Sequence, residues 1–446
     1  MKYDDIRGIL RYVPQFRGQT FIVLIDSGII EHENMANVML DLAVLHSLSI
    51  KLVVVFGARH QIAELAAKRG VTLSNADATG VTDEATLEVA LDAISRLTTD
   101  LMQQLTVVGL RAGVANAVAA HPAGVIRGKD LCSTGTIDRV DAQSLKLFIG
   151  DGMVPIIPPL GYEKQGRVLR VNSAATAVEV AIALGASKLL FVGPGAIEDA
   201  TGTRIRQLSV EEAKALSSAP VAAIGVAGAG PAPAAVTAPA AGDPGNLKHV
   251  QIRHAARACE GGVPRAHFLD GRTDDALLGE LFSIEGVGTM IYADAYQQIR
   301  PARKADIPGI IGLVRRAVDD EEIVARSRQE IREHLGDYFV LEVDGQLVGT
   351  VMVRSYPEEK LAEVGFLYIR RSHEGMGYGK KLVKFAEKRA RAFGAKILFA
   401  LSTQAYNYFG NKLGFLPAQE DLLPPERLSR LQKSGRNSKL MARVLS

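Results

Sequence analysis

The first two thirds of this chain alternate short apolar runs with segments of helical spacing, and this alternation constrains the fold more than any other feature. Between the first two runs, apolar residues recur at helical spacing from Met35 to Leu45. Strand–helix–strand alternation places successive strands parallel in a layered fold, so the pattern predicts an α/β domain with a mostly parallel sheet. The runs of strand length are 20–25, 51–56, 153–158, 187–193 and 265–270.

The pattern changes after the last of these runs, where a second and smaller domain is predicted. A short strand leads into a helix whose start Asp306 and Pro308 are suited to cap. A β-hairpin follows, and its Asp344-Gly345 pair suits a tight turn because glycine accepts positive φ. Further strands, a glycine-rich turn and a helix complete an α+β unit. We therefore expect a parallel-sheet domain at 1–292 and an α+β domain at 296–446.

Composition excludes several classes of protein. The 446 residues are 47% hydrophobic and 23% charged, which is typical of a soluble globular protein with two or three domains. The net charge of +3 is small, so nucleic acid is not favoured as a partner. Two cysteines, Cys132 and Cys259, are too few for a disulfide framework and fit a reducing, cytoplasmic compartment. Neither a signal peptide nor a run of about 18 apolar residues is found, so no membrane segment is expected.

The start of the chain is predicted to form an amphipathic helix. Ile6, Ile9, Leu10 and Val13 follow helical spacing and make one apolar stripe. Such a helix packs either on its own domain or on another subunit, and the spacing leaves both open.

An uncharged segment rich in Ala, Gly and Pro interrupts the first domain. It contains no charged residue from 217 to 242, and its prolines prevent a regular helix. We interpret 217–245 as a mobile loop, because a predicted helix at 247–260 and a strand follow it. A loop without function is the alternative.

The strongest chemical signal is the turn Glu374-Gly375-Met376-Gly377-Tyr378-Gly379-Lys380. Three alternate glycines between a strand and a helix expose backbone N–H groups at a helix N-terminus, where the dipole favours anions such as a pyrophosphate. A dinucleotide site is disfavoured, because the turn follows a hairpin sheet and not the first strand of a βαβ unit. The alternative is that these residues only form a tight turn and bind no ligand.

Residues from about 296 to 446 resemble the GNAT acetyltransferases, which bind acetyl-CoA through a loop Arg/Gln-x-x-Gly-x-Gly/Ala. Gly377 and Gly379 match this loop, whereas Glu374 stands where Arg or Gln is usual and is expected to point away from the pyrophosphate. The resemblance implies acetyl-CoA as co-substrate and no metal. The cofactor-binding residues that it implies are Phe366, Leu367, Tyr368, Gly375, Gly377, Tyr378, Gly379 and Lys380.

The resemblance sharpens to one family. The acetyltransferase half of bacterial N-acetylglutamate synthases is similar to segments 357–363, 400–403, 414–415, 421–424 and 435–439. The amino-acid-kinase-like half of the same synthases is similar to segments 30–62, 80–88, 135–141 and 277–291. It implies acetyl transfer from acetyl-CoA to the α-amine of L-glutamate, which gives N-acetyl-L-glutamate and CoA. This reaction is the first step of arginine biosynthesis.

The kinase-like half lacks the residues that phosphoryl transfer needs. Related kinases use lysines and an organising carboxylate to stabilise charge on the phosphate. Their first lysine aligns with Ile25, their catalytic aspartate with Ala174 and their later lysine near Ile252, while Gly57-Ala58-Arg59 replaces a triple glycine. We therefore predict no kinase activity.

Without kinase activity, the role expected for the kinase-like half is regulation and assembly. Arginine-sensitive relatives bind L-arginine between an N-terminal helix and the C-terminal part of the domain. The resemblance assigns Tyr12, Glu280 and Gly286 to that site and implies feedback inhibition by L-arginine in hexamers linked by the N-terminal helix. A carboxylate pairs well with a guanidinium. The alternative is that Glu280 faces solvent and Tyr12 only packs.

Acetyl transfer to an amine needs a base, because the α-amine is mostly protonated at neutral pH. Glu358 is our first choice for this base and Glu363 is the second; the alternative is that either one is a surface glutamate without a catalytic role. Ser402 is placed to bind water or the amine, and the alternative is that it only caps a strand. No general acid is assigned, although Tyr406 and Tyr408 are close to the expected position.

The acceptor carries two carboxylates, so its site needs cations and N–H donors. Arg315, Arg436 and Ser438 match substrate-binding positions of the family, and Lys360 is a further candidate. Three alternatives stay open: a bifunctional synthase-kinase, a non-catalytic arginine sensor, and a GNAT enzyme that acts on another amine.

Overall fold

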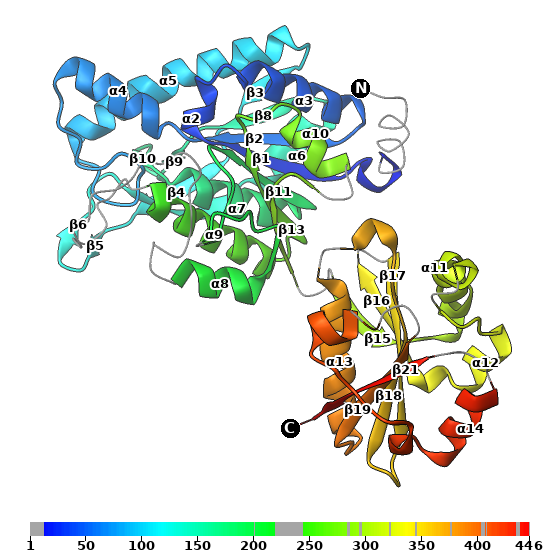
Figure 1. Cartoon of the computed structure of the whole chain (residues 1–446). Helices are drawn as coiled ribbons and strands as arrows, with labels where there is room; N and C mark the ends of the chain where they lie inside the picture. Colours follow the sequence, from blue (N-terminus) through cyan, green and yellow to red (C-terminus); the bar gives the residue numbers. More distant parts are fainter. Residues whose placement is uncertain are drawn as a thin grey trace. The chain divides into compact units, whose positions relative to one another are not determined.

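The computed structural model divides into two compact units, Met1–Ala293 and Asp294–Ser446 (Figure 1). Each unit is described by itself. The described residues are 13–199, 201–218, 244–282, 286–293, 297–320, 323–343, 346–374, 377–402, 406, 408–433 and 438–445.

The first unit is built on an eight-stranded, mostly parallel sheet. In spatial order its strands are β12 (Gln207–Ser209), β14 (Thr289–Tyr292), β13 (Arg265–Asp270), β11 (Lys188–Gly193), β1 (Thr20–Ile25), β2 (Lys51–Phe56), β8 (Val154–Ile157) and β3 (Ala112–Val114). β1 pairs in parallel with β11 and β2, whereas β13 and β14 pair antiparallel to each other. The five predicted runs are all strands of this sheet.

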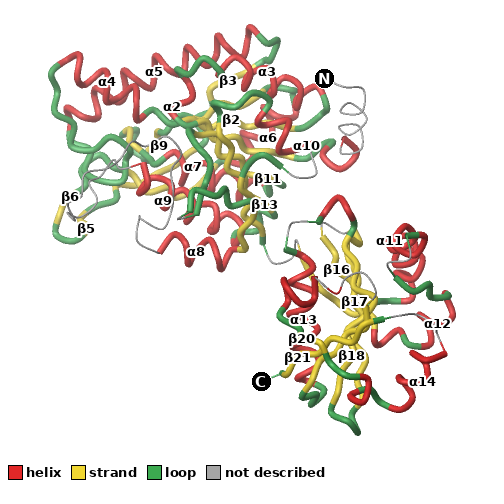
Figure 2. The backbone as a smooth tube through the Cα atoms, in the orientation of Figure 1, coloured by secondary structure: helices red, strands yellow, loops and turns green. Residues whose placement is uncertain are grey.

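Helices cover both faces of this sheet, because its central strands are apolar on both sides. Phe21, Val23 and Ile25 of β1 belong to one core, and Ile22 and Leu24 to the other. The first face carries α3 (Met35–Ser47), α4 (Arg59–Arg69), α5 (Glu84–Val107) and α10 (Ala276–Phe282); the second carries α6 (Ala142–Gly150), α7 (Ser173–Leu184), α8 (Val210–Ser218) and α9 (Pro244–Glu260). The result is a three-layer α/β sandwich (Figures 1 and 2).

Smaller elements complete the first unit. A four-stranded sheet has the order β10 (Val168–Arg170), β9 (Leu160–Tyr162), β4 (Val118–Pro122) and β7 (Gly135–Val140). A short hairpin pairs β5 (Val125–Ile126) with β6 (Lys129–Asp130), and the one-turn helix α2 (Ser27–Ile30) follows β1.

The second unit is built on a seven-stranded sheet with helices on both faces. Its strands in spatial order are β15 (Gln297–Pro301), β16 (Tyr338–Val343), β17 (Gln346–Tyr356), β18 (Leu361–Ile369), β19 (Ile397–Ser402), β21 (Lys439–Val444) and β20 (Leu416–Pro417). One face packs on α13 (Tyr378–Ala392). The other packs on α11 (Ile307–Asp319), α12 (Arg328–Glu333) and α14 (Pro425–Lys433).

Strands β18 and β19 are the parallel neighbours in this otherwise antiparallel sheet, and they separate after a short pairing. Their described register covers only Leu361–Glu363 against Ile397–Phe399. Beyond Glu363, β18 continues beside β17 with a register shift, and Phe366 there has a φ of 50°. A bulge of this kind bends a strand, so one edge of β18 is left open where the two strands diverge.

The predicted fold class is confirmed, and the helix predicted to start at Asp306 and Pro308 is found there, although the Asp306 side chain does not cap it. Asp306 does precede α11, but its carboxylate accepts from Arg303 N–H and the Arg300 guanidinium instead of capping α11 with its side chain. The pairing with Arg300, which also bonds Glu342, was not expected. Most of the predicted loop 217–245 lies outside the described residues.

Candidate active site

A cavity of about 120 Å³ opens where β18 and β19 diverge. Strand β18 contributes Glu363, Phe366 and Leu367, and β19 contributes Ser402. The sequence placed these residues in separate motifs; the parallel pairing of β18 with β19 brings them to one place. The other residues around the cavity include Ile323, Val324, Arg326, Met352, Leu401, Phe409, Arg427 and Ser438.

Glu363 is the buried carboxylate of this cavity. It is 5% exposed, and its strand neighbours Ala362 and Val364 pack into the core on the opposite face. Its oxygens accept two hydrogen bonds from Arg427, from Nε and Nη2, each at 2.8 Å. A third comes from the Tyr356 hydroxyl at 3.1 Å. A carboxylate held in this way is fixed in orientation.

Arg427 was not predicted from the sequence. Burial alone would lower its pKa, but the hydrogen bonds and charge of Glu363 outweigh burial and raise the pKa above its usual value. The pKa of Tyr356 is also raised, by burial and by the neighbouring Glu363 carboxylate, so the phenol stays protonated and donates. The cavity therefore holds one ion pair with a fixed hydrogen-bond donor beside it.

Two predicted residues lie away from the cavity, in the turn between β17 and β18. Glu358 and Lys360 are exposed there, and Lys360 has a φ of 54° while its carbonyl accepts from Lys396 N–H. Neither side chain lines the cavity. Of the two glutamates proposed as base, Glu363 is therefore the one beside Ser402.

The predicted acceptor residues are only partly brought together. Ser438, just before β21, lines the cavity and is half-buried. Arg315 lies exposed on α11 and does not line it. Arg436 lies outside the described residues. The cations that the described structure supplies to the cavity are the half-buried Arg427 and Arg326, which both line it.

The glycine-rich turn leads into α13 as predicted. Gly377 is the residue before the helix and has a φ of 77°, which favours glycine. Lys380 is exposed and Gly379 half-buried, so the first-turn N–H groups, which have no partner within a helix, lie near the surface. Gly375 is outside the described residues. The open edge of β18 and this helix start fit an extended acyl carrier that ends in phosphates.

Tyr378 departs from the simple expectation of a cofactor contact. Its side chain is 4% exposed, and its hydroxyl accepts from Gln297 Nε2 at 3.0 Å. Among the predicted carrier residues, Phe366, Leu367 and Tyr368 lie on β18, where the bulge alters their register.

The kinase-like unit has a small cleft at the carboxyl ends of β1 and β2, of about 40 Å³. Ala174 and Gly57-Ala58-Arg59 line it, whereas Ile25 and Ile252 are fully buried in the core. The sequence analysis missed Lys248, which is 5% exposed, lies near Asp26 and donates to the Gly195 carbonyl at 3.0 Å. Burial lowers its pKa.

Glu280 is buried, so the alternative in which it only faces solvent is wrong. One oxygen bonds His267 Nδ1 at 2.7 Å, and the other accepts from the N–H groups of Val287 and Gly288, each at 2.7 Å. Burial and the nearby Lys188 lower the pKa of His267 to about 4. Burial opposes ionisation of Glu280, but the His267 and backbone hydrogen bonds lower its pKa to about 2.

The surroundings of Glu280 connect it with the start of the described chain. Gly286, with a φ of 62°, directly precedes Val287 and Gly288, which supply the two N–H groups. Lys188 Nζ lies 3.3 Å from His267 Nε2 and over the ring of Phe16. Tyr12 lies outside the described residues.

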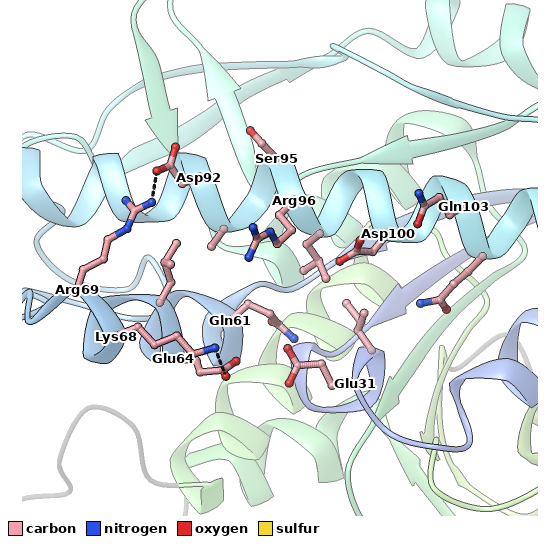
Figure 3. A pocket seen from close by; sticks show the side chains of 15 residues that line it. Glu31, Gln61, Glu64, Lys68, Arg69, Asp92, Ser95, Arg96, Asp100 and Gln103 are labelled. Carbon is pink, nitrogen blue, oxygen red and sulfur yellow. Dashed lines mark hydrogen bonds and ion pairs between the residues drawn. The ribbon is translucent and has the colours of Figure 1, made fainter.

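A larger cleft of about 650 Å³ lies between α4 and α5 (Figure 3). Its charges are largely matched within the cleft, since Arg69 pairs with Asp92 and Lys68 with Glu64. We assign no ligand to it.

Neither a cluster of metal ligands nor a membrane-spanning helix is found in the part of the chain that the structure describes. No three His, Cys, Asp or Glu side chains come together there as a metal ion would need. No described helix is both long and apolar enough to cross a bilayer.

Comparison with known proteins agrees with this geometry. Residues 21–228 match the amino acid kinase family and residues 309–415 the acetyltransferase (GNAT) family. The amino-acid acetyltransferase of Pseudomonas fluorescens is 31% identical over 97% of both chains. That of Neisseria meningitidis serogroup A is 32% identical over 97% of this chain and 96% of its own. This chain belongs to the amino-acid acetyltransferase family. It is an N-acetyltransferase that uses acetyl-CoA.

Solved structures of this family are similar over the whole chain. The N-acetylglutamate synthase of Neisseria gonorrhoeae with coenzyme A and L-arginine has a TM-score of 0.77 at 29% identity, with 100% of both chains covered. The same enzyme with coenzyme A and N-acetyl-glutamate has a TM-score of 0.61 at 30% identity, with the same coverage. The resemblance to N-acetylglutamate synthases in both halves is thereby confirmed.

Proposed function

We propose that this acetyltransferase transfers the acetyl group of acetyl-CoA to the α-amine of L-glutamate, as the first step of arginine biosynthesis. The observation that carries the proposal is the cavity between β18 and β19, where the buried Glu363 carboxylate and the Arg427 guanidinium lie beside Ser402 and Ser438. The gonorrhoeal relative was solved with N-acetyl-glutamate, the product of this reaction.

In the proposed mechanism Glu363 is the base, in place of our first choice, Glu358. It takes a proton from the α-ammonium directly or through a water held by Ser402, and the free amine attacks the thioester carbonyl. A backbone N–H on the open edge of β18 stabilises the tetrahedral oxyanion. The C–S bond then breaks as the amide forms, and the second proton that the attacking nitrogen loses passes to the leaving CoA thiolate.

The acceptor's carboxylates are proposed to bind the cations around the same cavity. Arg427 is a half-buried cation at the cavity, and Arg436 and Ser438 follow it in the chain as the family pattern implies. Arg315 and Lys360 remain weaker candidates, because neither lines the cavity. A small dicarboxylate suits this arrangement better than a protein lysine, which would bring a further positive charge.

Regulation by L-arginine is proposed for the first unit, so that 1–292 regulates and 296–446 catalyses. The gonorrhoeal relative was also solved with L-arginine. Glu280 supports the proposal, since its buried carboxylate beside Gly286 is ionised and already held by three hydrogen bonds, from His267, Val287 and Gly288. Feedback inhibition fits a first step controlled by its end product.

We also propose a homo-oligomer, a hexamer as in the family pattern, in the cytoplasm. Strand β3 is an edge of the large sheet, and exposed apolar side chains surround it: Val107 is 86%, Leu147 70% and Val114 47% exposed. An exposed edge with apolar neighbours favours pairing with another chain. The free thiols of Cys132 and Cys259 fit a reducing compartment.

Two assays test the proposal. Release of free thiol from acetyl-CoA should be fastest with L-glutamate among a panel of amino acids, and added L-arginine should slow it. Equal rates with aspartate, lysine and glutamate would reject the assigned acceptor. ATP consumption with N-acetyl-glutamate tests the bifunctional alternative; no consumption is expected, because Ile25 and Ala174 replace charged residues.

A further inference from the structure

Gln297, in the first strand of the acetyltransferase unit, is tied to the first turn of α13. Its side chain is buried, at 7% exposed, although it is an amide on an edge strand. Its Nε2 donates to the Tyr378 hydroxyl at 3.0 Å, and its Oε1 accepts from Lys381 Nζ at 2.8 Å. One carboxamide therefore holds two residues of the same helical turn, 81 and 84 residues away in the chain.

The turn that Gln297 holds is the one proposed to receive the phosphates of CoA. Tyr378 is the first residue of α13 and follows the left-handed Gly377. The Tyr378 phenol is buried against Gln297, so this residue offers the cofactor its backbone and not its ring. Gly379 has no side chain, so it too can contact the cofactor only through its backbone.

Anion binding by backbone N–H groups depends on where those groups point. Preorganised donors cost no reorganisation when the ligand arrives, whereas a loose first turn must be ordered on binding. A helix start that follows a flexible glycine has little internal restraint, because its first N–H groups have no partner within the helix. An external anchor on Tyr378 and Lys381 supplies that restraint.

We propose that Gln297 is a positioning residue for acetyl-CoA, which fixes the first turn of α13 so that its N–H groups point at the phosphates. It does this without touching the cofactor itself. The inference rests on the proposed binding of acetyl-CoA at this turn. It makes CoA affinity depend on β15, a strand outside the cavity.

The test compares full-length variants by calorimetric titration with coenzyme A and by the KM for each substrate. Gln297→Ala removes both contacts and is expected to weaken CoA binding by about tenfold, the effect of one to two net hydrogen bonds. The KM for acetyl-CoA should rise in proportion, and the KM for L-glutamate should change less than about twofold. Gln298→Ala is the matched control, because Gln298 is the exposed neighbour on the same strand.

Several results would overturn the inference. CoA affinity of Gln297→Ala equal to that of Gln298→Ala would show that the anchor is dispensable. A parallel rise in both KM values would indicate general damage, and tighter CoA binding would mean that Gln297 only restrains the Lys381 ammonium. Should Gln297→Ala not fold, Gln297→Glu keeps an acceptor for Lys381 and loses the Nε2 donor; wild-type CoA affinity in that variant would reject the proposal.

The titration also separates this inference from the proposed function. CoA binding is measured without an acceptor, so it remains decisive even where glutamate proves not to be the acceptor. Tyr378→Phe adds a second arm, since it removes the hydroxyl but leaves the contact between Lys381 and Gln297. It is expected to weaken CoA binding by less than Gln297→Ala, and an effect larger than that of Gln297→Ala would contradict the assigned geometry.

Discussion

Replacing Arg427 by alanine is expected to destabilise the acetyltransferase unit strongly. The side chains of Arg427 and Glu363 are 17% and 6% exposed, and two parallel hydrogen bonds of 2.8 Å join them. Removing one partner of a buried pair leaves an uncompensated charge, which typically costs about 3–5 kcal/mol. The Tyr356 donor remains and the cavity admits water, so we expect the lower end, about 3 kcal/mol.

Arg430 on the same helix is the matched control. It pairs with Glu426 four residues earlier, and the two side chains are 50% and 71% exposed. Such a surface pair contributes about 0–0.5 kcal/mol, so Arg430→Ala should be almost neutral. In a unit of about 150 residues, 3 kcal/mol corresponds to a fall of about 6–12 °C in its melting temperature.

Calorimetry on the full-length protein is the suitable assay, since the chain has no tryptophan to report unfolding by fluorescence. A double-mutant cycle with Glu363→Gln isolates the pair, because the glutamine removes the charge but keeps the shape. Arg427→Ala should be much less harmful in that background. Equal melting temperatures for Arg427→Ala and Arg430→Ala, or strict additivity with Glu363→Gln, would refute the reasoning.

Three further predictions concern the base, the effector and pH. Glu363→Gln should lower kcat by about a hundredfold or more in the thiol-release assay, whereas Glu358→Gln should stay within about twofold; the reverse order would restore Glu358 as the base. Glu280→Gln should reduce the response of turnover to L-arginine, compared with the same variant without arginine; unchanged inhibition would place the effector elsewhere. The pKa of His267 is lowered from 6.5 to about 4 in the folded protein, so the unfolded chain binds its proton more readily. His267 should therefore contribute a loss of stability to the first unit as pH falls from about 6.5 to about 4. Because Asp41, whose pKa burial raises to about 7, acts in the opposite direction over this range, calorimetry should compare the wild type with His267→Gln. An equal change in stability with pH in both proteins would contradict the assigned burial.

The sequence predicts the layers of this protein better than its charge network. Apolar runs such as 20–25 and 51–56 identify strands directly, because a strand covered on both faces must be apolar along its length. The switch to a hairpin and a glycine-rich turn likewise identifies the second unit. Each of these features spans a short stretch of the chain, so it can be recognised from the sequence without knowing which distant residues come together in the fold.

The choice between Glu358 and Glu363 shows what local pattern misses. The two residues lie five positions apart in one motif, yet one is in an exposed turn and the other faces a cavity within a strand. The strand boundary at Leu361 decides the difference, and strand boundaries are the weakest part of a sequence-based prediction.

No pattern in the sequence indicated that Arg427 lies at the site. It belongs to a short, strongly amphipathic segment in which charged residues are usually solvated, and its neighbour Arg430 is indeed exposed. Its partner Glu363 lies 64 residues earlier. Lys188, His267 and Glu280 form a second group of this kind, whose members are distant in the chain and buried together.

The ion pair also bears on how the site selects its acceptor. Arg427 is bound to the carboxylate that we propose as base, so an incoming carboxylate competes with Glu363 for the same guanidinium. An acceptor with a suitably placed carboxylate draws the cation toward itself and weakens its hold on Glu363, which frees a carboxylate oxygen of Glu363 to accept from the amine. An amine without that carboxylate meets a base that is still paired. Under the proposed function, binding of a dicarboxylate and release of the base are thus coupled through one arginine, and this coupling would favour glutamate at the chemical step as well as in binding.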